Sequence, residues 1–286
     1  MPRGEEGARV TDLEEESARA RLAPLLERDP IPLDEAALAI AAEEYPALAP
    51  AGYLARLDAL AARVADRAGT PLRAAAALRA LRDVLHGEAG LRGNAEAYYD
   101  PRNSYLSDVL DRGLGIPITL SLVYMEVARR VGLALEGVAL PGHFVARLAP
   151  PAGPPVYVDA FSGELLSEEE CLARHRERTG ASTPGPGALP PATARQVLAR
   201  LLGNLRRIHG ERRDDVRLYT VLDQLLLVTP EQLDALRDRG LCAARLGAAG
   251  PARRDLEAYL AQAPGRGDAA EVQAALAGLT GKRLLN

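Results

Sequence analysis

Three consecutive segments decide the fold of this chain: GLGIPITLSLVYMEVARRVG at 113–132, LEGVALPGHFVARL at 135–148 and VYVDAFSG at 156–163. The first segment predicts a helix from Pro117 to Val131, because proline is tolerated at the first helical position and a glycine follows the end. This helix is apolar nearly all round, so we expect it to be buried. The segment 135–148 predicts two short strands, and the segment 156–163 predicts a third. The second and third of these strands are expected to form an antiparallel pair.

Two polar residues stand on the predicted strands, His143 at the start of one and Asp159 in the next. In an antiparallel pair they can be cross-strand neighbours, which would place a carboxylate against an imidazole nitrogen. A buried helix, a strand with histidine and a strand with aspartate resemble, in this order, the active site of papain-like and transglutaminase-like enzymes. The same pair can instead be a contact that only satisfies two half-buried polar groups. The sequence leaves both interpretations open.

The nucleophilic cysteine of such an enzyme is missing. Where a transglutaminase would carry glycine, any residue and cysteine, this chain reads Gly-Ile-Pro and ends the motif at Pro117. Thr119 is a nearby hydroxyl that His143 could activate as a substitute nucleophile. A threonine early in a helix, however, commonly bonds its own backbone. We therefore expect a re-purposed hydrolase core.

The chain's cysteines and histidines suggest neither a thiol site nor a metal site. Cys171 follows three glutamates, which raise the pKa of a thiol, and Cys242 has the surroundings of a packed helix. The four histidines lack metal-ligand spacing. We therefore expect no metal and no other cofactor.

Composition narrows the class of protein further. The 286 residues include no Trp and two Phe, and Ala and Leu dominate, which favours helices packed on helices with at most a small sheet. A formal net charge of -4 argues against a nucleic-acid partner, because phosphate binding needs a clustered basic face. A signal peptide and an apolar run of about 18 residues are both missing. We expect a soluble cytoplasmic protein without membrane contact.

The length is sufficient for two domains. We expect an N-terminal extension at 1–30, a first domain at 31–178, a linker rich in Gly and Pro at 179–193, and a helical domain at 194–286.

The last of these segments carries a repeat. Pro230 and Pro264 lie one period of 34 residues apart, and this period with a closing proline resembles the tetratricopeptide repeat. Gly240 and Ala252 occupy positions where the two helices of that repeat touch closely. A generic pair of helical hairpins is the alternative interpretation.

Several motifs together resemble a bacterial family of SirB type, described as a regulator of expression of the SirC transcription factor. They are the runs Tyr98–Leu106, Gly115–Ser121, Gly137–Phe144 and Val158–Gly163. The resemblance implies a transglutaminase-like domain followed by tetratricopeptide repeats, and it implies that Gly-Ile-Pro at the helix start is a family trait. A related domain in some eukaryotic F-box proteins would suit a binding role.

The motifs also nominate residues for a ligand pocket: Tyr99, Asn103, Pro117, His143 and Asp159. The polar turn that contains Asn103 is expected to cap a short helix through Asn103 or the following serine, Ser104.

These observations predict an α+β, mostly helical fold: a transglutaminase-like, or papain-like, domain with a small antiparallel sheet, followed by tetratricopeptide-like helical hairpins. The favoured function is a non-catalytic protein in protein–protein interaction or regulation, which binds a protein or peptide through the repeats. One alternative is a hydrolase or acyl-transferase that uses His143 and Asp159 with Thr119 or a water molecule. Another is a scaffold in which the first domain only caps the repeats.

Overall fold

The structure, a computed structural model, describes residues 18–149, 153–180 and 189–281. Its contacts divide the chain into a first unit, Asp29–Leu201, and a repeat unit made of Met1–Arg28 with Leu202–Asn286. The start of the expected N-terminal extension and the middle of the expected linker lie outside the described residues.

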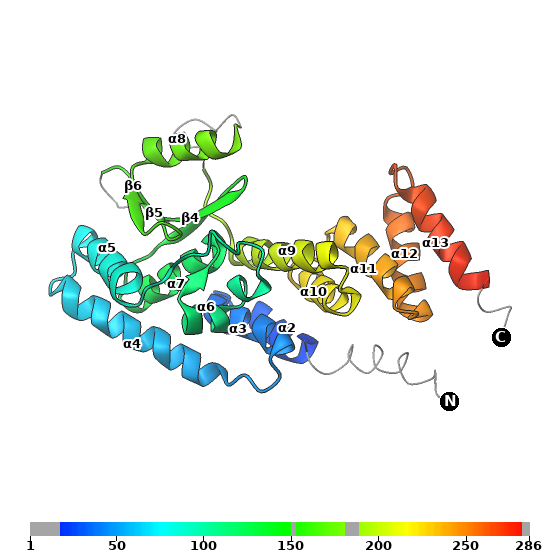
Figure 1. The fold of residues 1–286 in the computed structure, drawn as a ribbon, viewed down its shortest axis with the longest axis horizontal. Coiled ribbons are helices and arrows are strands. Elements are labelled where there is room, and N and C mark those ends of the chain that lie inside the picture. The colour runs from blue at the N-terminus through cyan, green and yellow to red at the C-terminus, as the bar shows by residue number, and fades with distance from the viewer. Residues whose placement is uncertain (1–17, 150–152, 181–188, 282–286) are drawn as a thin grey trace. The chain divides into compact units, whose positions relative to one another are not determined.

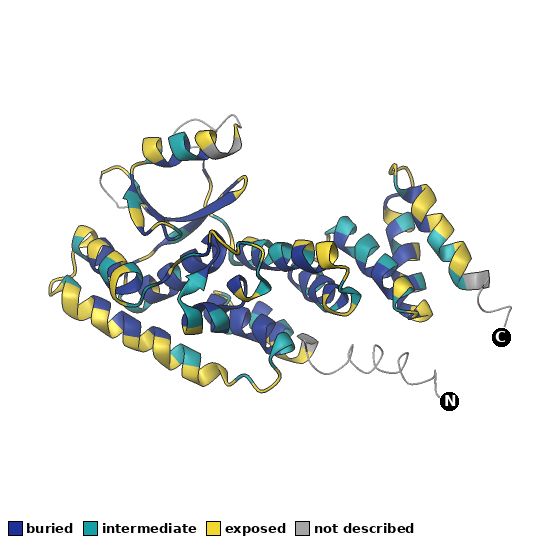
Figure 2. Cartoon of the chain, in the orientation of Figure 1, coloured by how far each residue is buried: buried dark blue, intermediate teal, exposed yellow. Residues whose placement is uncertain are grey.

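The first unit is built mainly from helices (Figure 1). They are α3 (Leu33–Glu44), α4 (Pro50–Ala68), α5 (Ala74–Arg82), a π-helical turn (Asp83–Glu88), a 3-10 turn (Pro101–Asn103), α6 (Leu106–Arg112), α7 (Pro117–Arg130), α8 (Glu168–Thr179) and the start of α9 (Ala194–Arg212). Figure 2 shows α7 buried along most of its length, whereas the outer side of α4 is exposed. The difference follows from sequence, since α4 has one apolar stripe and the first three turns of α7 are apolar nearly all round.

A four-stranded antiparallel sheet lies beside α7. Its strands are β3 (Glu136–Leu140), β4 (His143–Leu148), β5 (Val156–Asp159) and β6 (Glu164–Leu166), and they pair in chain order. The structure confirms the predicted antiparallel pair and adds β6, a strand that the sequence analysis did not predict. A second, parallel pair joins β1 (Arg92–Gly93) to β2 (Leu114–Gly115), directly before α7.

Each face of the larger sheet has its own cover. Val145 and Tyr157 belong to one buried cluster with Cys171 and Leu172 of α8. On the other face Phe144 packs so closely on Gly137 that a Cβ there would stand 2.6 Å from the ring, with Met125 of α7 beside it. Side chains alternate along a strand, so His143 shares its face with Val145.

The described residues of the repeat unit form helices and no strands. They are α2 (Ala18–Leu26), the rest of α9, α10 (Asp215–Val228), α11 (Leu233–Arg245), α12 (Ala249–Gln262) and α13 (Ala269–Gly281). The hairpin of α11 and α12 confirms the interpretation of Gly240: a Cβ at this residue would stand 2.7 Å from Leu256. Ala252 is fully buried in the same hairpin. The short residues are needed because the two helices touch there.

Helix α2 contacts α10 and so extends the helical array. Leu22 is fully buried and Leu26 is 6% exposed. The segment that the sequence analysis treated as an extension therefore contributes apolar side chains to the repeat unit.

Candidate functional site

The start of α7, where a transglutaminase would place its cysteine, is closed by the chain's own backbone. Ile116 has the extended conformation of an N-cap residue, and buried Pro117 occupies the first turn. The Thr119 hydroxyl donates to the carbonyl oxygen of Asn103 at 2.6 Å and approaches the carbonyl of Ile116 at 3.3 Å. Thr119 is fully buried, so its proton is directed to backbone carbonyls.

Asn103 organises the turn that receives this hydroxyl. Its side-chain amide donates to the carbonyls of Ala97 and Tyr98 at 2.7 and 3.2 Å. Its side-chain oxygen accepts from Asn94 at 3.0 Å. The expected cap was wrong: the N-cap of α6 is Tyr105, and no side chain caps this helix. The Asn103 side-chain oxygen, which a cap would use as acceptor, already accepts from Asn94. A side-chain cap is found on the 3-10 turn instead, where Asp100 accepts from the Arg102 N–H.

His143 and Asp159 are in contact. The Nε2 atom of His143 lies 3.2 Å from Oδ2 of Asp159, and the two residues are 7% and 1% exposed. Asp159 Oδ1 accepts from the Phe161 N–H at 3.1 Å, which fixes the carboxylate. The β4–β5 register pairs Ala146 with Val158, so the next pair would be Val145 with Asp159. His143 is therefore a diagonal and not a direct cross-strand neighbour of Asp159, a separation that longer side chains still bridge.

A small aromatic group continues from this carboxylate. Phe161 lies at 6.1 Å from Tyr98, which makes an edge contact with Tyr99 at 5.3 Å between ring centroids. The Phe161 ring covers Gly93, where a Cβ would come within 2.4 Å of ring carbons. Tyr99 is 50% exposed, so it is the member of the group that a partner could reach.

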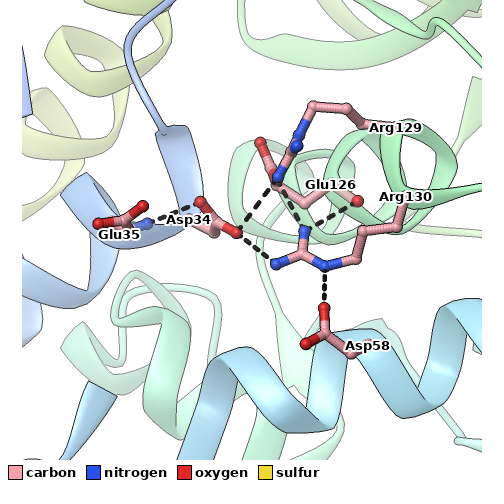
Figure 3. Close-up of polar contacts among 6 residues, drawn as sticks. All are labelled: Asp34, Glu35, Asp58, Glu126, Arg129 and Arg130. Atoms are coloured by element: carbon pink, nitrogen blue, oxygen red, sulfur yellow. Dashed lines mark hydrogen bonds and ion pairs between the residues drawn. The ribbon is translucent and has the colours of Figure 1, made fainter. Parts of the chain in front are cut away.

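Ion pairs hold α7 to its neighbouring helices (Figure 3). The Arg130 guanidinium donates to Asp34 of α3 at 2.5 Å and to Asp58 of α4 at 2.7 Å. It also donates to Glu126, one helical turn earlier, at 2.9 Å. Arg129 donates to the same Glu126 carboxylate at 2.7 Å. This network fixes the orientation of α7 from the end opposite to Pro117.

The two buried carboxylates of the network differ in their pKa. Burial raises the pKa of Asp34, but hydrogen bonds from Arg130 and from the Glu35 N–H outweigh it and leave the pKa below its ordinary value. Burial, followed by the charge of Asp34, raises the pKa of Glu126 despite its arginine partners. The network therefore holds one stabilised carboxylate and one that resists ionisation.

Both cysteines are buried. Cys171 belongs to the apolar cluster between the sheet and α8. The Cys242 thiol donates to the Asp215 carbonyl at 3.0 Å, and burial together with the charge of Asp215 raises its pKa to about 12. A thiol with that pKa is protonated at neutral pH and is a poor nucleophile.

The described residues place the candidates in separate roles. His143 and Asp159 contact each other, and Thr119 and Asn103 form a second hydrogen-bonded group. Pro117 begins the first turn of α7, and Tyr99 lies on the surface. Among residues 18–149, 153–180 and 189–281, no three histidine, cysteine or acidic side chains gather as metal ligands. In the same ranges every helix is too short or too polar to span a bilayer.

Four contributors to this region were not predicted from the sequence. Asn94 follows a glycine in an ordinary loop pattern, and Tyr98 and Phe161 stand inside motifs without any local sign of their contact. Glu126 is different, because an acidic residue on a helix that is otherwise apolar can be recognised in the sequence. An acidic side chain on a helix that must be buried requires a cation nearby.

The sequence matches the transglutaminase-like superfamily over residues 51–203 and the tetratricopeptide repeat over residues 205–277. A UPF0162 protein of Xylella fastidiosa (strain 9a5c) is 37% identical over 262 residues, which cover 89% of this chain and 92% of that protein. A UPF0162 protein of Pseudomonas aeruginosa is 36% identical over 190 residues, which cover 65% and 67%. F-box only protein 21 of Mus musculus is 33% identical over 171 residues, which cover 56% and 26%. No solved structure matches the chain.

Proposed function

We propose that this chain, which belongs to the transglutaminase-like superfamily and to the UPF0162 family, is a non-catalytic protein that acts through protein–protein interaction. The transglutaminase-like unit would serve as a binding and scaffolding module. The repeat unit would contact a protein or peptide partner, a role typical of tetratricopeptide repeats.

One observation carries the non-catalytic part of the proposal. The fully buried Thr119 hydroxyl donates to the Asn103 carbonyl at 2.6 Å. A substitute nucleophile would have to give its proton to an imidazole in order to attack. With the thiol replaced by Pro117 and this proton held by a carbonyl, the helix start offers no activated nucleophile.

The regulatory role implied by the SirB-type resemblance and a cytoplasmic site of action belong to this proposal. So do the domain limits, with a first domain at 31–178 and a second at 194–286. Limited proteolysis of the full chain checks these limits. First cuts within 179–193 that leave two protected fragments support them, and first cuts elsewhere contradict them.

A direct activity test separates the proposal from the hydrolase or acyl-transferase alternative. The full-length protein is incubated with a panel of amide and ester substrates, beside His143→Ala and Thr119→Val variants whose folds are checked by circular dichroism. We expect all three proteins to show the same background rate. Turnover by the wild type that disappears in His143→Ala with the fold intact would overturn the proposal; its loss in Thr119→Val as well would name the nucleophile, and its retention there would indicate water.

A second test asks whether the frame is a relic of an active site. Pro117→Cys is made in a background of Cys171→Ser and Cys242→Ser, and the pH dependence of alkylation by iodoacetamide gives the apparent pKa of the new thiol. The positive end of a helix lowers the pKa of a thiol at its N-terminus, and an imidazolium beside the thiol would lower it further. The control is Ser162→Cys, at an exposed residue. We expect the lower pKa at position 117, and equal values would argue against a relic site.

A further inference from the structure

The repeat unit contains a pocket of about 560 Å³ between the α9–α10 turn, α10 and α11. Its lining includes Arg213, Asp215, Leu218, Asp238, Leu241 and Arg245. The volume lies in the range of about 300–1,000 Å³ that is usual for small-molecule sites. A peptide segment of a few residues is of similar size.

Both carboxylates at this pocket already have cationic partners. Asp215 accepts three hydrogen bonds from Arg245, two from Nε at 3.0 Å and one from Nη2 at 2.7 Å. These bonds hold the pKa of Asp215 below its ordinary value. Asp238 accepts from Arg237 at 2.9 and 2.7 Å and also pairs with Arg206. Because both carboxylates are already paired with arginines, they do not require a cationic group on the ligand.

Arg213 differs from the other arginines around the pocket. It is exposed, and no residue in the described ranges forms a hydrogen bond or an ion pair with its guanidinium. Its φ of 54° makes it the one residue other than glycine that has a positive φ among the described residues. Glycine or asparagine would suit this conformation better. The chain keeps an unmatched positive charge at a position where backbone geometry favours a smaller residue.

Apolar surface lies beside this charge. Leu218 and Leu241 line the pocket. Val216, in the first turn of α10, is 55% exposed and is one of three large hydrophobic residues exposed in the described part of the chain. A ligand that matches the pocket must therefore carry an anionic group next to an aliphatic one.

We infer that this pocket binds a peptide segment of a partner protein in which an acidic side chain adjoins an aliphatic side chain. The carboxylate pairs with Arg213 and the aliphatic group packs on Leu218 and Leu241. This inference rests on the proposed function in assigning partner binding to the repeats, and it adds the site and the chemistry of the partner. The charge-assisted pair with Arg213 selects peptides that carry a carboxylate. The contact with Leu218 and Leu241 contributes affinity that does not depend on salt concentration.

The experiment uses the full-length protein and a positional library of acetylated, amidated hexapeptides in which every residue pair is sampled. Retained peptides are identified, and the best one is labelled with fluorescein for anisotropy titration. We expect enrichment of Asp or Glu next to Leu, Ile or Val. Arg213→Gly removes the cation and suits the positive φ, so the fold should persist while affinity for the best peptide falls about tenfold, the loss of one charge-assisted pair.

Two further variants and one control sharpen the result. Arg213→Glu should reverse the preference toward Lys and Arg, and Leu241→Ala should weaken binding without changing the charge preference. The control is Arg253→Ala, on α12 and outside the pocket, whose only ion pair in the described residues is a long one of 3.9 Å to Glu257. It should bind as the wild type does.

Each remaining outcome counts against the inference. These outcomes are that the protein retains no peptide, that the retained peptides show no preference for Asp or Glu, or that the wild type and Arg213→Gly bind the best peptide with equal affinity. A dimer in sedimentation that Arg213→Gly dissolves would assign the pocket to a second copy of the chain instead. The substrate panel described above reports on the non-catalytic role separately, so a failure here with no turnover there leaves that role standing.

Discussion

The two units of this protein use their polar side chains differently. In the first unit the candidate site residues point at one another or at the backbone: His143 at Asp159, and Thr119 at the carbonyl of Asn103. In the repeat unit the buried ions are equally well paired, but Arg213 stands unmatched at an open pocket.

The difference indicates where each unit can act on another molecule. Polar groups that satisfy one another inside a fold stabilise it and have little left to offer a ligand. A charge that the fold leaves unmatched is available for binding. We therefore expect variants at the frame to affect stability and variants at the pocket to affect recognition.

The largest effect expected from a single substitution is in the repeat unit, at its buried ion network. Arg239 donates to Asp255 at 2.6 and 2.9 Å and to Asp223 at 2.5 Å, and all three are less than 10% exposed. Arg239→Leu removes the cation that the two buried carboxylates share, and Asp255 keeps a longer contact with Arg254, at 3.6 Å. We expect a loss of about 3–5 kcal/mol in the free energy of unfolding, measured by urea denaturation. Arg253→Ala, at a half-buried site with one long ion pair, should stay near wild type. A loss below about 1 kcal/mol at Arg239 would refute the structural role.

In the first unit, Asp159→Ala should cost about 1–3 kcal/mol, because it leaves the buried His143 imidazole and the Phe161 N–H without their acceptor. A double-mutant cycle with His143→Ala measures how much of this loss belongs to the pair. If the two losses simply add, the contact has no energetic importance and its structural role is wrong.

A smaller effect is expected at Thr119. Thr119→Val keeps the shape of the side chain and removes the hydrogen bond to the Asn103 carbonyl, so stability should fall by about 1 kcal/mol. The matched control is Thr220→Val in α10, whose hydroxyl approaches its own helix carbonyl at 3.3 Å in an exposed position. Thermal unfolding of both variants gives the comparison. Equal losses would mean that the closure of the α7 start contributes nothing special.

The smallest effect concerns the slope of stability with pH. The pKa of Glu126 is raised above its ordinary 4.5 by burial and then by Asp34. Ionising Glu126 therefore costs stability as the pH rises from about 4.5 through its folded pKa, and Glu126→Gln lacks this cost. The stability of the variant relative to wild type should increase between pH 4.5 and 7. Asp34 has a lowered pKa and loses its contribution only below its ordinary 3.8, outside that window.

A relative stability that stays flat or falls over this range would mean that Glu126 is not the group that resists ionisation. Urea titrations at several pH values measure it, and Asp66→Asn, at an exposed residue of α4, serves as the control for a general charge effect.

The sequence predicted correctly those elements that are determined by residues close together in the chain. The run from Pro117 is apolar nearly all round and became the buried helix α7. The β4 strand begins at His143, as predicted, because Pro141-Gly142 forms a turn immediately before it. The small residues Gly240 and Ala252 marked a close helix contact that the structure confirms. The strand at Glu164–Leu166 was not predicted, since three residues carry too little alternation to recognise.

Other features have causes that are distant along the chain. Asp223, Arg239 and Asp255 stand sixteen residues apart in sequence, and each alone reads as a solvated charge on a helix. The sequence around Leu22 gives no sign that α2 contacts α10.

The sequence by itself therefore determined the two-part architecture, the buried helix, the missing cysteine and the repeat. Each depends on periodicity or on the identity of one residue. Only the tertiary structure decided that the Thr119 proton goes to a carbonyl, that Asn103 builds a turn and does not cap a helix, and that Arg213 is left unmatched. Hydrogen bonds and ion pairs depend on distances of a few tenths of an ångström between residues far apart in the chain, and packing sets those distances.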